Sequence, residues 1–256
     1  MLSAWEAILL GLLQGFTEFL PVSSSGHLVL AQHYLGFEEP LLTFDIAVHM
    51  GTLAAVISAF WGDVKALLKN PISKTMLLLI IGTLPAVLAA LLLGDYIDAM
   101  FSSLTVVTLA LILTGLLLQI SDSFSGQSRV EDMSYQKVLI VGLFQAAAIV
   151  PGLSRSGSTI FGSLFSGLNR EEAARFSFLL SIPVILGAAC KQMLDMRHIG
   201  DISLHWTYLL GAVVAAVVGY ASIRLFLKLL GKKSLRYFGY YCWALAALVT
   251  VSRLFG

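Results

Sequence analysis

The sequence predicts an all-α polytopic integral membrane protein with six full spans, arranged as two inverted repeats. Three observations support this fold class. Of the 256 residues, 58% are hydrophobic and 12% are charged, whereas a soluble domain carries about 25% charged residues. The first half of the chain also resembles the second half at a constant spacing. Finally, long stretches lack Asp, Glu, Lys and Arg altogether: 46–62, 76–94, 99–121, 206–223 and 237–252.

The apolar stretches predict two kinds of membrane segment. Crossing a bilayer core of about 30 Å takes about 20 apolar helical residues. Two pairs of segments are too short for comfortable spans, and Pro and Ser-Gly break each pair: 5–20 with 24–36, and 135–150 with 155–167. We expect these pairs to be re-entrant helical hairpins, since non-helical backbone at membrane depth must be buried or line a cavity. The full spans are predicted at 44–62, 76–94, 104–121, 176–192, 206–227 and 237–255.

An internal repeat relates the two hairpins. The stretch "GLLQGFTEFLPVSSSG" (11–26) aligns with "GLFQAAAIVPGLSRSG" (142–157), so that Gln14 matches Gln145 and Gly26 matches Gly157. Within one membrane domain, 1–256, this gives repeat one at about 1–125 and repeat two at about 132–256. Three crossings per half invert the second half, so the hairpins enter from opposite faces and meet near the midplane, as in other inverted-repeat proteins with buried sites.

The charged loops predict an orientation. Lys and Arg are concentrated in cytoplasmic loops, and the loops 63–75 and 228–236 carry seven of them on one side of the predicted topology, whereas the loop 95–103 is acidic and falls on the other side. Both chain ends and the mouth of the first hairpin are therefore expected to face outward. The basic residues are Lys65, Lys69, Lys74, Lys228, Lys232, Lys233 and Arg236.

The first hairpin places polar groups at membrane depth. Gln14 and Glu18 are four residues apart and share one helix face, and Pro21 ends that helix. Ser23, Ser24 and Ser25 can cap the next helix, whose positive dipole end then points inward, and His27 lies in its first turn. Charges buried at this depth cost at least a few kcal/mol each, so they are functional candidates.

The second hairpin supplies a cation. In "PGLSRSGST", Ser154 or Ser156 can cap the following helix and Arg155 lies beside its N-terminus. Two helix N-termini, an arginine fork and several hydroxyls are well suited to bind phosphate.

The two hairpins have diverged in their charged groups. At the repeat spacing Glu18 corresponds to Ile149, and Ser24 corresponds to Arg155. Phosphoryl transfer requires charge neutralisation opposite a nucleophile, proton carrier or metal ligand, which this division provides. Structural alternatives remain: the Ser and Gly residues can serve helix packing, Glu18 can be a neutral hydrogen-bonded acid, and Arg155 can pair with Glu18 merely to close the hairpins. Asp45 and His49 share a helix face and could support the first hairpin.

The motifs "QGFTEFLPVSSSGHL" and "PGLSRSGST", together with "TFDIAVHMGTLAAV", resemble the signature motifs of the undecaprenyl-diphosphate phosphatase (bacitracin-resistance) family along the whole chain. The resemblance implies a bacterial inner-membrane enzyme that removes the terminal phosphate of undecaprenyl diphosphate and so recycles the lipid carrier for peptidoglycan synthesis. Such a hydrolase confers bacitracin resistance. The lipid is the expected partner, no nucleic acid is expected, and the site is predicted to open to the periplasmic face.

The resemblance also assigns roles to residues. It places Glu18, Ser24, His27 and Arg155 in the catalytic set. It implies a divalent cation, Mg²⁺ or Ca²⁺, with Gln14 and Glu18 as tentative ligands. Gln14 stands where many members of the family have an acid, which puts a two-carboxylate metal cage in doubt. The predicted phosphate-binding residues are Ser23, Ser25, Ser154, Arg155, Ser156 and Thr159.

Two questions stay open at this point. Either His27 attacks phosphorus directly or it activates Ser24 as the nucleophile. A transporter or flippase of a prenyl phosphate lipid is the alternative function, since inverted repeats with broken helices are typical of transporters.

Overall fold

The computed structural model describes residues 2–39, 41–124, 126–199, 205–230 and 234–255. For residues 95, 98 and 192–199 it describes the course of the helix but not the side chains. The described ranges contain eleven α-helices, one 3₁₀ turn, η1 (Val130–Asp132), and one isolated β-bridge between Ser128 and Leu168. Lys232 and Lys233, two of the basic residues used to predict the orientation, lie outside the described residues.

Six described helices are long and apolar enough to cross a bilayer, which confirms the predicted number of spans. The main difference concerns the predicted loop 95–103, because α5 continues without a break to Phe101 before Ser102 ends it. Neither Gly nor Pro interrupts residues 95–101, so nothing stops the helix earlier. The six helices are α3 (Leu42–Ala59), α5 (Lys74–Phe101), α6 (Leu104–Ser121), α9 (Arg170–Ile199), α10 (Trp206–Leu230) and α11 (Arg236–Phe255).

Each half of the chain begins with a pair of short helices, as the sequence predicts. In the first half these are α1 (Ala4–Thr17) and α2 (Ser24–Tyr34), and in the second half α7 (Tyr135–Ala147) and α8 (Arg155–Phe165). Helices of 11–14 residues are shorter than the roughly 20 residues that a span needs. Each half thus has one hairpin followed by three spans, and the inverted relation of the halves stays a prediction.

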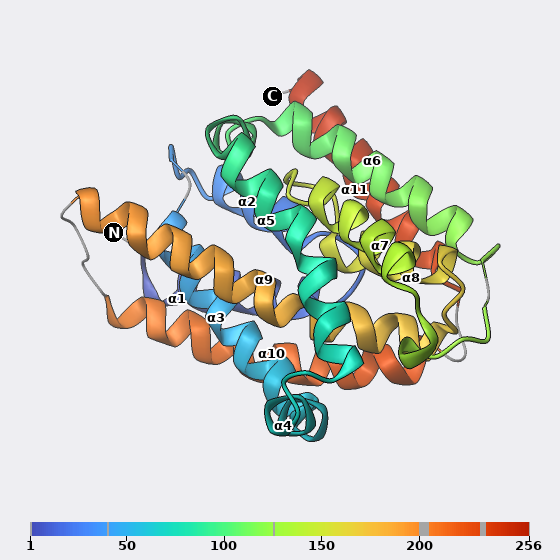
Figure 1. Cartoon of the computed structure of the whole chain (residues 1–256). Coiled ribbons are helices and arrows are strands. Elements are labelled where there is room, and N and C mark those ends of the chain that lie inside the picture. Colours follow the sequence, from blue (N-terminus) through green and yellow to red (C-terminus); the bar gives the residue numbers. More distant parts are fainter. Residues whose placement is uncertain (1, 40, 125, 200–204, 231–233, 256) are drawn as a thin grey trace.

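A short helix replaces the end of the first predicted span. The predicted span 44–62 ends at Ala59, and α4 (Trp61–Lys69) follows after Phe60. Residues 63–75 were predicted to be a loop, but residues 61–69 form an amphipathic helix in which Trp61, Leu68 and both lysines, Lys65 and Lys69, are exposed. Helix α4 lies apart from the main bundle in Figure 1.

The long helices pack in pairs that combine the two halves. Helix α10 packs against α1 and α3, α5 packs against α7, and α6 lies along α11 (Figure 1). Glycines bring some of these backbones close together: a Cβ on Gly51 would lie 2.1 Å from the Ala212 carbonyl oxygen, and one on Gly11 would lie 2.6 Å from that of Gly211. Small residues that permit such contacts are typical of membrane helix interfaces.

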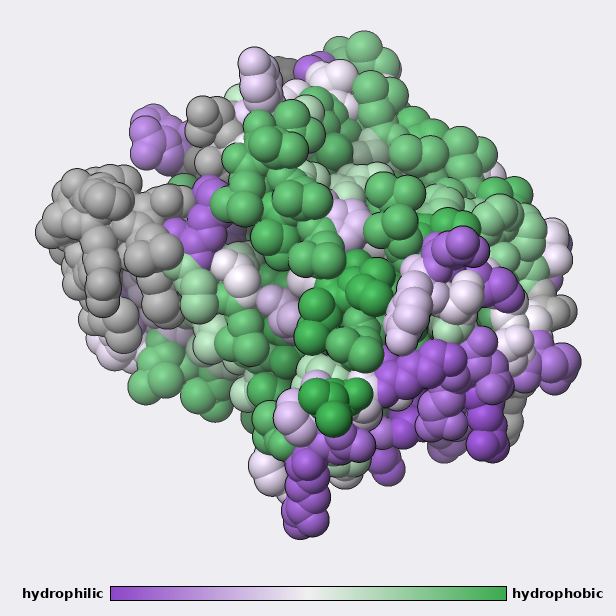
Figure 2. Space-filling view, in the orientation of Figure 1, coloured by the Kyte–Doolittle hydropathy of each residue, from purple (hydrophilic) through white to green (hydrophobic). Residues whose placement is uncertain are grey.

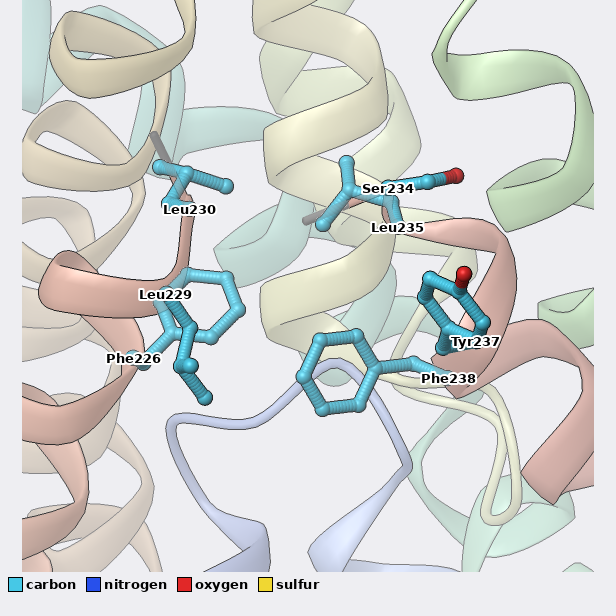
Figure 3. A pocket seen from close by; sticks show the side chains of 7 residues that line it. All are labelled: Phe226, Leu229, Leu230, Ser234, Leu235, Tyr237 and Phe238. Carbon is cyan, nitrogen blue, oxygen red and sulfur yellow. The ribbon is translucent and has the colours of Figure 1, made fainter. Parts of the chain in front are cut away.

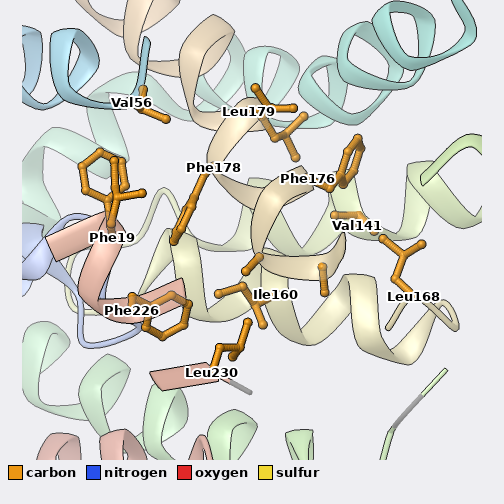
Figure 4. Packing of buried hydrophobic residues seen from close by; sticks show 14 of the residues in the cluster. Phe19, Val56, Val141, Ile160, Leu168, Phe176, Phe178, Leu179, Phe226 and Leu230 are labelled. Carbon is orange, nitrogen blue, oxygen red and sulfur yellow. The ribbon is translucent and has the colours of Figure 1, made fainter. Parts of the chain in front are cut away.

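A buried hydrophobic cluster contains three phenylalanines that connect the turn of the first hairpin to the spans (Figure 4). Phe178 of α9 lies at its centre, with its ring centroid 5.4 Å from Phe19 and 5.7 Å from Phe226. All three side chains are fully buried. The turn of the first hairpin is therefore anchored to spans of the second half.

The surface agrees with insertion in a bilayer. In Figure 2 apolar residues cover most of the visible face, and hydrophilic residues gather towards its lower right, near α4 and the segment between α6 and α7. Many large apolar side chains on the spans are exposed, including Leu92, Leu109 and Leu248. Such a surface would be unstable in water and suits contact with lipid.

Candidate active site

Glu18 lies at the centre of the candidate site, where α1 ends and the first hairpin bends. Its Oε1 accepts a hydrogen bond from Arg155 Nη2 at 2.6 Å, and its Oε2 accepts one from Ser24 Oγ at 2.6 Å. Gln14, one turn earlier, donates from Nε2 to the same Oε2 at 3.0 Å. The side chain is 6% exposed. The buried Glu18 carboxylate therefore contacts the Ser24 hydroxyl of its own hairpin and the Arg155 guanidinium of the other hairpin.

Arg155 begins α8 and is held in place by α9. Its Nη1 donates to the Ser177 carbonyl oxygen at 3.1 Å. The Thr159 hydroxyl donates to the Arg155 carbonyl oxygen at 2.8 Å and lies 2.6 Å from Ser177 Oγ. Thr159 is fully buried and does not line the pocket described below. Its hydroxyl, predicted to bind phosphate, is engaged within the protein and supports the arginine.

The three serines of the first hairpin all border the pocket. Ser23 caps α2 by accepting a hydrogen bond from the Gly26 N–H at 3.2 Å. Its backbone has φ 71° and ψ 92°, and it is the one non-glycine residue with positive φ among those described. Such a conformation costs about 1–3 kcal/mol and persists at functional sites where the surroundings enforce it.

The tips of the hairpins touch each other. Gly152 donates its N–H to Ser25 Oγ at 3.5 Å, and Ser156 Oγ donates to the Leu20 carbonyl oxygen at 3.0 Å. A Cβ on Gly26 would lie 3.0 Å from the Gly152 Cα. The hairpin turns are therefore packed backbone against backbone.

Ser154 and Ser156, predicted to bind phosphate, serve this packing in the structure. Ser154 Oγ accepts a hydrogen bond from the Gly157 N–H at 3.0 Å, which caps α8, and it lies 3.2 Å from Ser156 Oγ. Both side chains are buried, and neither lines the pocket.

His27 points away from the pocket. Its Nδ1 donates to the Ser23 carbonyl oxygen at 2.7 Å, and its Nε2 lies 2.8 Å from the Tyr241 hydroxyl on α11. The two rings are parallel, with centroids 5.6 Å apart. The structure thus engages both ring nitrogens of His27 and does not bring the ring together with Glu18 and Arg155, although the sequence analysis placed it in the catalytic set.

A pocket of 880 Å³ opens beside Glu18, Ser24 and Arg155. It extends from these residues to the ends of the spans at Leu42 and Ser102. The polar groups lie at the hairpins, and apolar side chains from α5 and α9 form a long wall. The wall residues are Ala86, Ala90, Ile97, Val184, Ile185 and Ala188.

Further polar residues also line this pocket: Thr43, Asp45, His49, Ser102, Gln145 and Lys191. His49 Nε2 lies 3.7 Å from Glu18 Oε2, and Asp45 accepts a hydrogen bond from Gln32 Nε2 at 2.7 Å. From the sequence, Asp45 and His49 were expected only as possible supporting residues on one helix face. Gln145 was recognised only as the repeat partner of Gln14, and that match was the signal that could have identified it.

The donor set around the pocket suits a divalent cation that completes its shell with substrate. Among the described residues no three His, Cys, Asp or Glu side chains form a metal cage. The oxygens Gln14 Oε1 and Gln145 Oε1 are buried without a hydrogen-bond partner, and only Gln145 of these two residues lines the pocket. One carboxylate together with phosphate oxygens is a usual arrangement for Mg²⁺.

A second, smaller cavity of 260 Å³ lies where α10 ends and α11 begins (Figure 3). Its lining is almost entirely apolar, with Ser234 and the Tyr237 hydroxyl as its polar groups. Among the described residues around it there is no acid or cation, so these residues do not offer the groups of an anion-binding site.

The fold and the site define a multi-pass membrane protein with a buried polar centre between two helical hairpins. The family described as "Bacitracin resistance protein BacA" matches residues 7–248. The chain belongs to this family.

Curated relatives match over nearly their full length. The chain is 41% identical to an undecaprenyl-diphosphatase of Halothermothrix orenii, covering 96% of this chain and 97% of the relative. It is 41% identical to one of Carboxydothermus hydrogenoformans, covering 100% and 99%. It is 43% identical to one of Rubrobacter xylanophilus, covering 97% and 98%.

Proposed function

We propose that this chain is an undecaprenyl-diphosphatase, which hydrolyses undecaprenyl diphosphate to undecaprenyl phosphate and inorganic phosphate. The contact of Glu18 with both Arg155 and Ser24 carries the proposal, because it places a carboxylate, a permanent cation and a hydroxyl in one pocket. The names of the relatives support the substrate. This activity recycles the lipid carrier for peptidoglycan synthesis and confers bacitracin resistance.

The pocket suggests how the lipid is held. The diphosphate lies at the hairpins, where Arg155 and the N-terminal turn of α2 bind its oxygens. The prenyl chain lies along the apolar wall of α5 and α9 and continues into the bilayer. When the diphosphate enters, the Arg155 guanidinium exchanges part of its contact with Glu18 for phosphate oxygens.

Ser24 is the proposed nucleophile. Its hydroxyl already donates to Glu18 Oε2 at 2.6 Å, so Glu18 takes the proton as Ser24 Oγ bonds to the terminal phosphorus. The bond from that phosphorus to the bridging oxygen breaks, and undecaprenyl phosphate leaves. Water then attacks the phosphoserine, Glu18 returns its proton to Ser24 Oγ, and inorganic phosphate is released. Arg155 stabilises the charge that develops in both steps.

The other predicted residues have supporting parts in this scheme. His27 holds the Ser23 carbonyl and thereby the turn that carries Ser24. Glu18 and an acceptor oxygen of the pocket would hold Mg²⁺ or Ca²⁺, with Gln14 fixing the carboxylate through its amide. A bound divalent cation supplies charge neutralisation at the phosphates.

The proposed location is the bacterial inner membrane, with the pocket opening to the periplasmic face. The pocket reaches the start of α3 at Leu42 and the end of α5 at Ser102, whereas Lys65 in α4 follows the other end of α3 and Lys74 begins α5. Since basic loops are cytoplasmic, the pocket mouth then faces outward, and so do both chain ends. The division into inverted repeats at about 1–125 and 132–256 belongs to this proposal.

A phosphate-release assay tests the function. Purified protein in detergent, given undecaprenyl diphosphate with Mg²⁺ or Ca²⁺, should release inorganic phosphate, and Ser24→Ala should not. With substrate labelled in the terminal phosphate, quenched enzyme should carry an acid-stable phosphoserine. An acid-labile phosphoenzyme would instead indicate histidine. Movement of lipid across proteoliposomes without any phosphate release would favour the transport alternative.

A further inference from the structure

His49 presents one ring nitrogen to the candidate active site. It lies on α3, one turn after Asp45, and its Nδ1 is 2.6 Å from the Asp45 carbonyl oxygen. A carbonyl oxygen only accepts hydrogen bonds, so Nδ1 carries the proton. In the neutral ring Nε2 is then an unprotonated acceptor, and this is the nitrogen next to Glu18.

Two acceptors therefore face each other. His49 Nε2 lies 3.7 Å from Glu18 Oε2, which also accepts hydrogen bonds from Ser24 and Gln14, and both Glu18 and His49 line the same pocket. Arg155 occupies the other carboxylate oxygen, Oε1. Lone pairs that converge in this way are stabilised by a positive charge placed between them. Imidazole nitrogens whose other ring N–H is held by a backbone carbonyl are typical metal ligands.

A third acceptor belongs to Gln145, another residue that lines the pocket. Gln145 Oε1 has no hydrogen-bond partner, although the side chain is only 1% exposed. The orientation of its amide is fixed, because Nε2 donates to the Gly82 carbonyl oxygen at 3.0 Å. An unsatisfied buried acceptor costs free energy unless a ligand or cation binds it.

We propose that His49 Nε2 and Glu18 Oε2 are ligands of one divalent cation, and that the nitrogen ligand makes this site favour Mn²⁺ over Ca²⁺. The inference rests on the cation that the proposed function includes. Mn²⁺ prefers oxygen ligands, as Ca²⁺ and Mg²⁺ do, but as a first-row transition ion it accepts an imidazole ligand more readily than they do. Because the protein supplies few ligands, phosphate oxygens and water complete the shell, and Gln145 Oε1 accepts a hydrogen bond from that water.

Binding of Mn²⁺ to the purified full chain tests the proposal directly. Mn²⁺ is titrated by electron paramagnetic resonance, with and without inorganic phosphate, and pulsed measurements detect magnetic coupling to ¹⁴N. We expect coupling of the kind that an imidazole ligand gives. His49→Gln should abolish the coupling and weaken Mn²⁺ binding by about tenfold or more. His33→Gln is the matched control, because His33 is exposed and does not line the pocket.

A second variant separates loss of the ligand from loss of the fold. His49→Glu replaces nitrogen by oxygen, so it should still bind Mn²⁺ but without ¹⁴N coupling, and its preference should shift towards Ca²⁺. Wild-type protein that binds Mn²⁺ without ¹⁴N coupling, or binds no Mn²⁺ at all, would overturn the inference. Coupling that survives in His49→Gln would do the same. Phosphate release by the wild type is measured separately, so these results leave the proposed function to its own assay.

Discussion

Removal of the Arg155 side chain should lower activity, because the phosphate loses a cation, and should lower stability, because Glu18 loses its ion-pair partner. The guanidinium donates to Glu18 at 2.6 Å and to the Ser177 carbonyl at 3.1 Å. Arg155→Ala removes both contacts and the only cation that the described structure shows hydrogen-bonded to Glu18. The variant therefore leaves a carboxylate that is 6% exposed without its ion-pair partner.

The magnitudes follow from these contacts. Loss of one preorganised donor to a developing charge costs about 10²–10³ in rate, and loss of an arginine that stabilises a phosphoryl transition state costs about 10³–10⁵. We expect kcat/KM to fall by about 10³ or more, which corresponds to roughly 4 kcal/mol. Breaking one side of a buried ion pair costs about 3–5 kcal/mol of stability.

A double variant distinguishes the two effects. Glu18→Gln in the Arg155→Ala background removes the uncompensated charge, so thermal stability in detergent should recover while phosphate release stays low. Arg155→Lys keeps the charge but cannot reach two partners with a planar fork, so it should retain a small part of the activity. The assay is phosphate release from undecaprenyl diphosphate. Arg155→Ala with activity within tenfold of the wild type would refute the reasoning.

Three other substitutions test the supporting structure. Thr159→Val removes the hydroxyl that contacts the Arg155 carbonyl oxygen and Ser177 Oγ. Because this loses about one hydrogen bond's free energy, kcat/KM should fall by roughly tenfold. A kcat/KM equal to that of the wild type at every pH would contradict this role. Gly51→Ala forces a Cβ to within 2.1 Å of the Ala212 carbonyl oxygen and should destabilise the protein by about 1–3 kcal/mol, measured by thermal unfolding against Gly62→Ala, where a Cβ meets nothing within 4 Å. Ala188→Phe adds bulk to the apolar wall and so narrows the pocket. It should raise KM for undecaprenyl diphosphate more than KM for a short prenyl diphosphate. Leu186 does not line the pocket, so Leu186→Phe should leave both KM values unchanged.

Sequence alone predicted the number and approximate positions of the spans well because hydropathy and helix breakers act locally. The runs without charge mark the spans, and Pro21 with the serines that follow marks the first hairpin turn. Helix α4 and the extension of α5 to Phe101 were not predicted. When only hydropathy is considered, a short amphipathic helix such as α4 and a helix end with charged residues such as that of α5 both resemble loops.

The site was predicted in part. Glu18 and Arg155 stand out because a charge within an apolar run needs a partner, and they are in contact. The direction of His27 could not be predicted, because the positive φ of Ser23 sets how α2 leaves the turn and so which neighbour the ring meets. His49 and Gln145 depend on how α3 and α7 are rotated against their neighbours, which no local pattern records.

The division of the Glu18–Arg155 pair between the two hairpins has a consequence for biogenesis. During synthesis the first hairpin enters the membrane about 137 residues before its partner cation is made, since the pair joins residues that far apart in the chain. Until then the acid has no counter-charge and must stay protonated or near water. Docking of the second hairpin therefore completes both membrane insertion and the reactive centre. A chain truncated after the first half would contain Glu18 without its ion-pair partner and would be inactive.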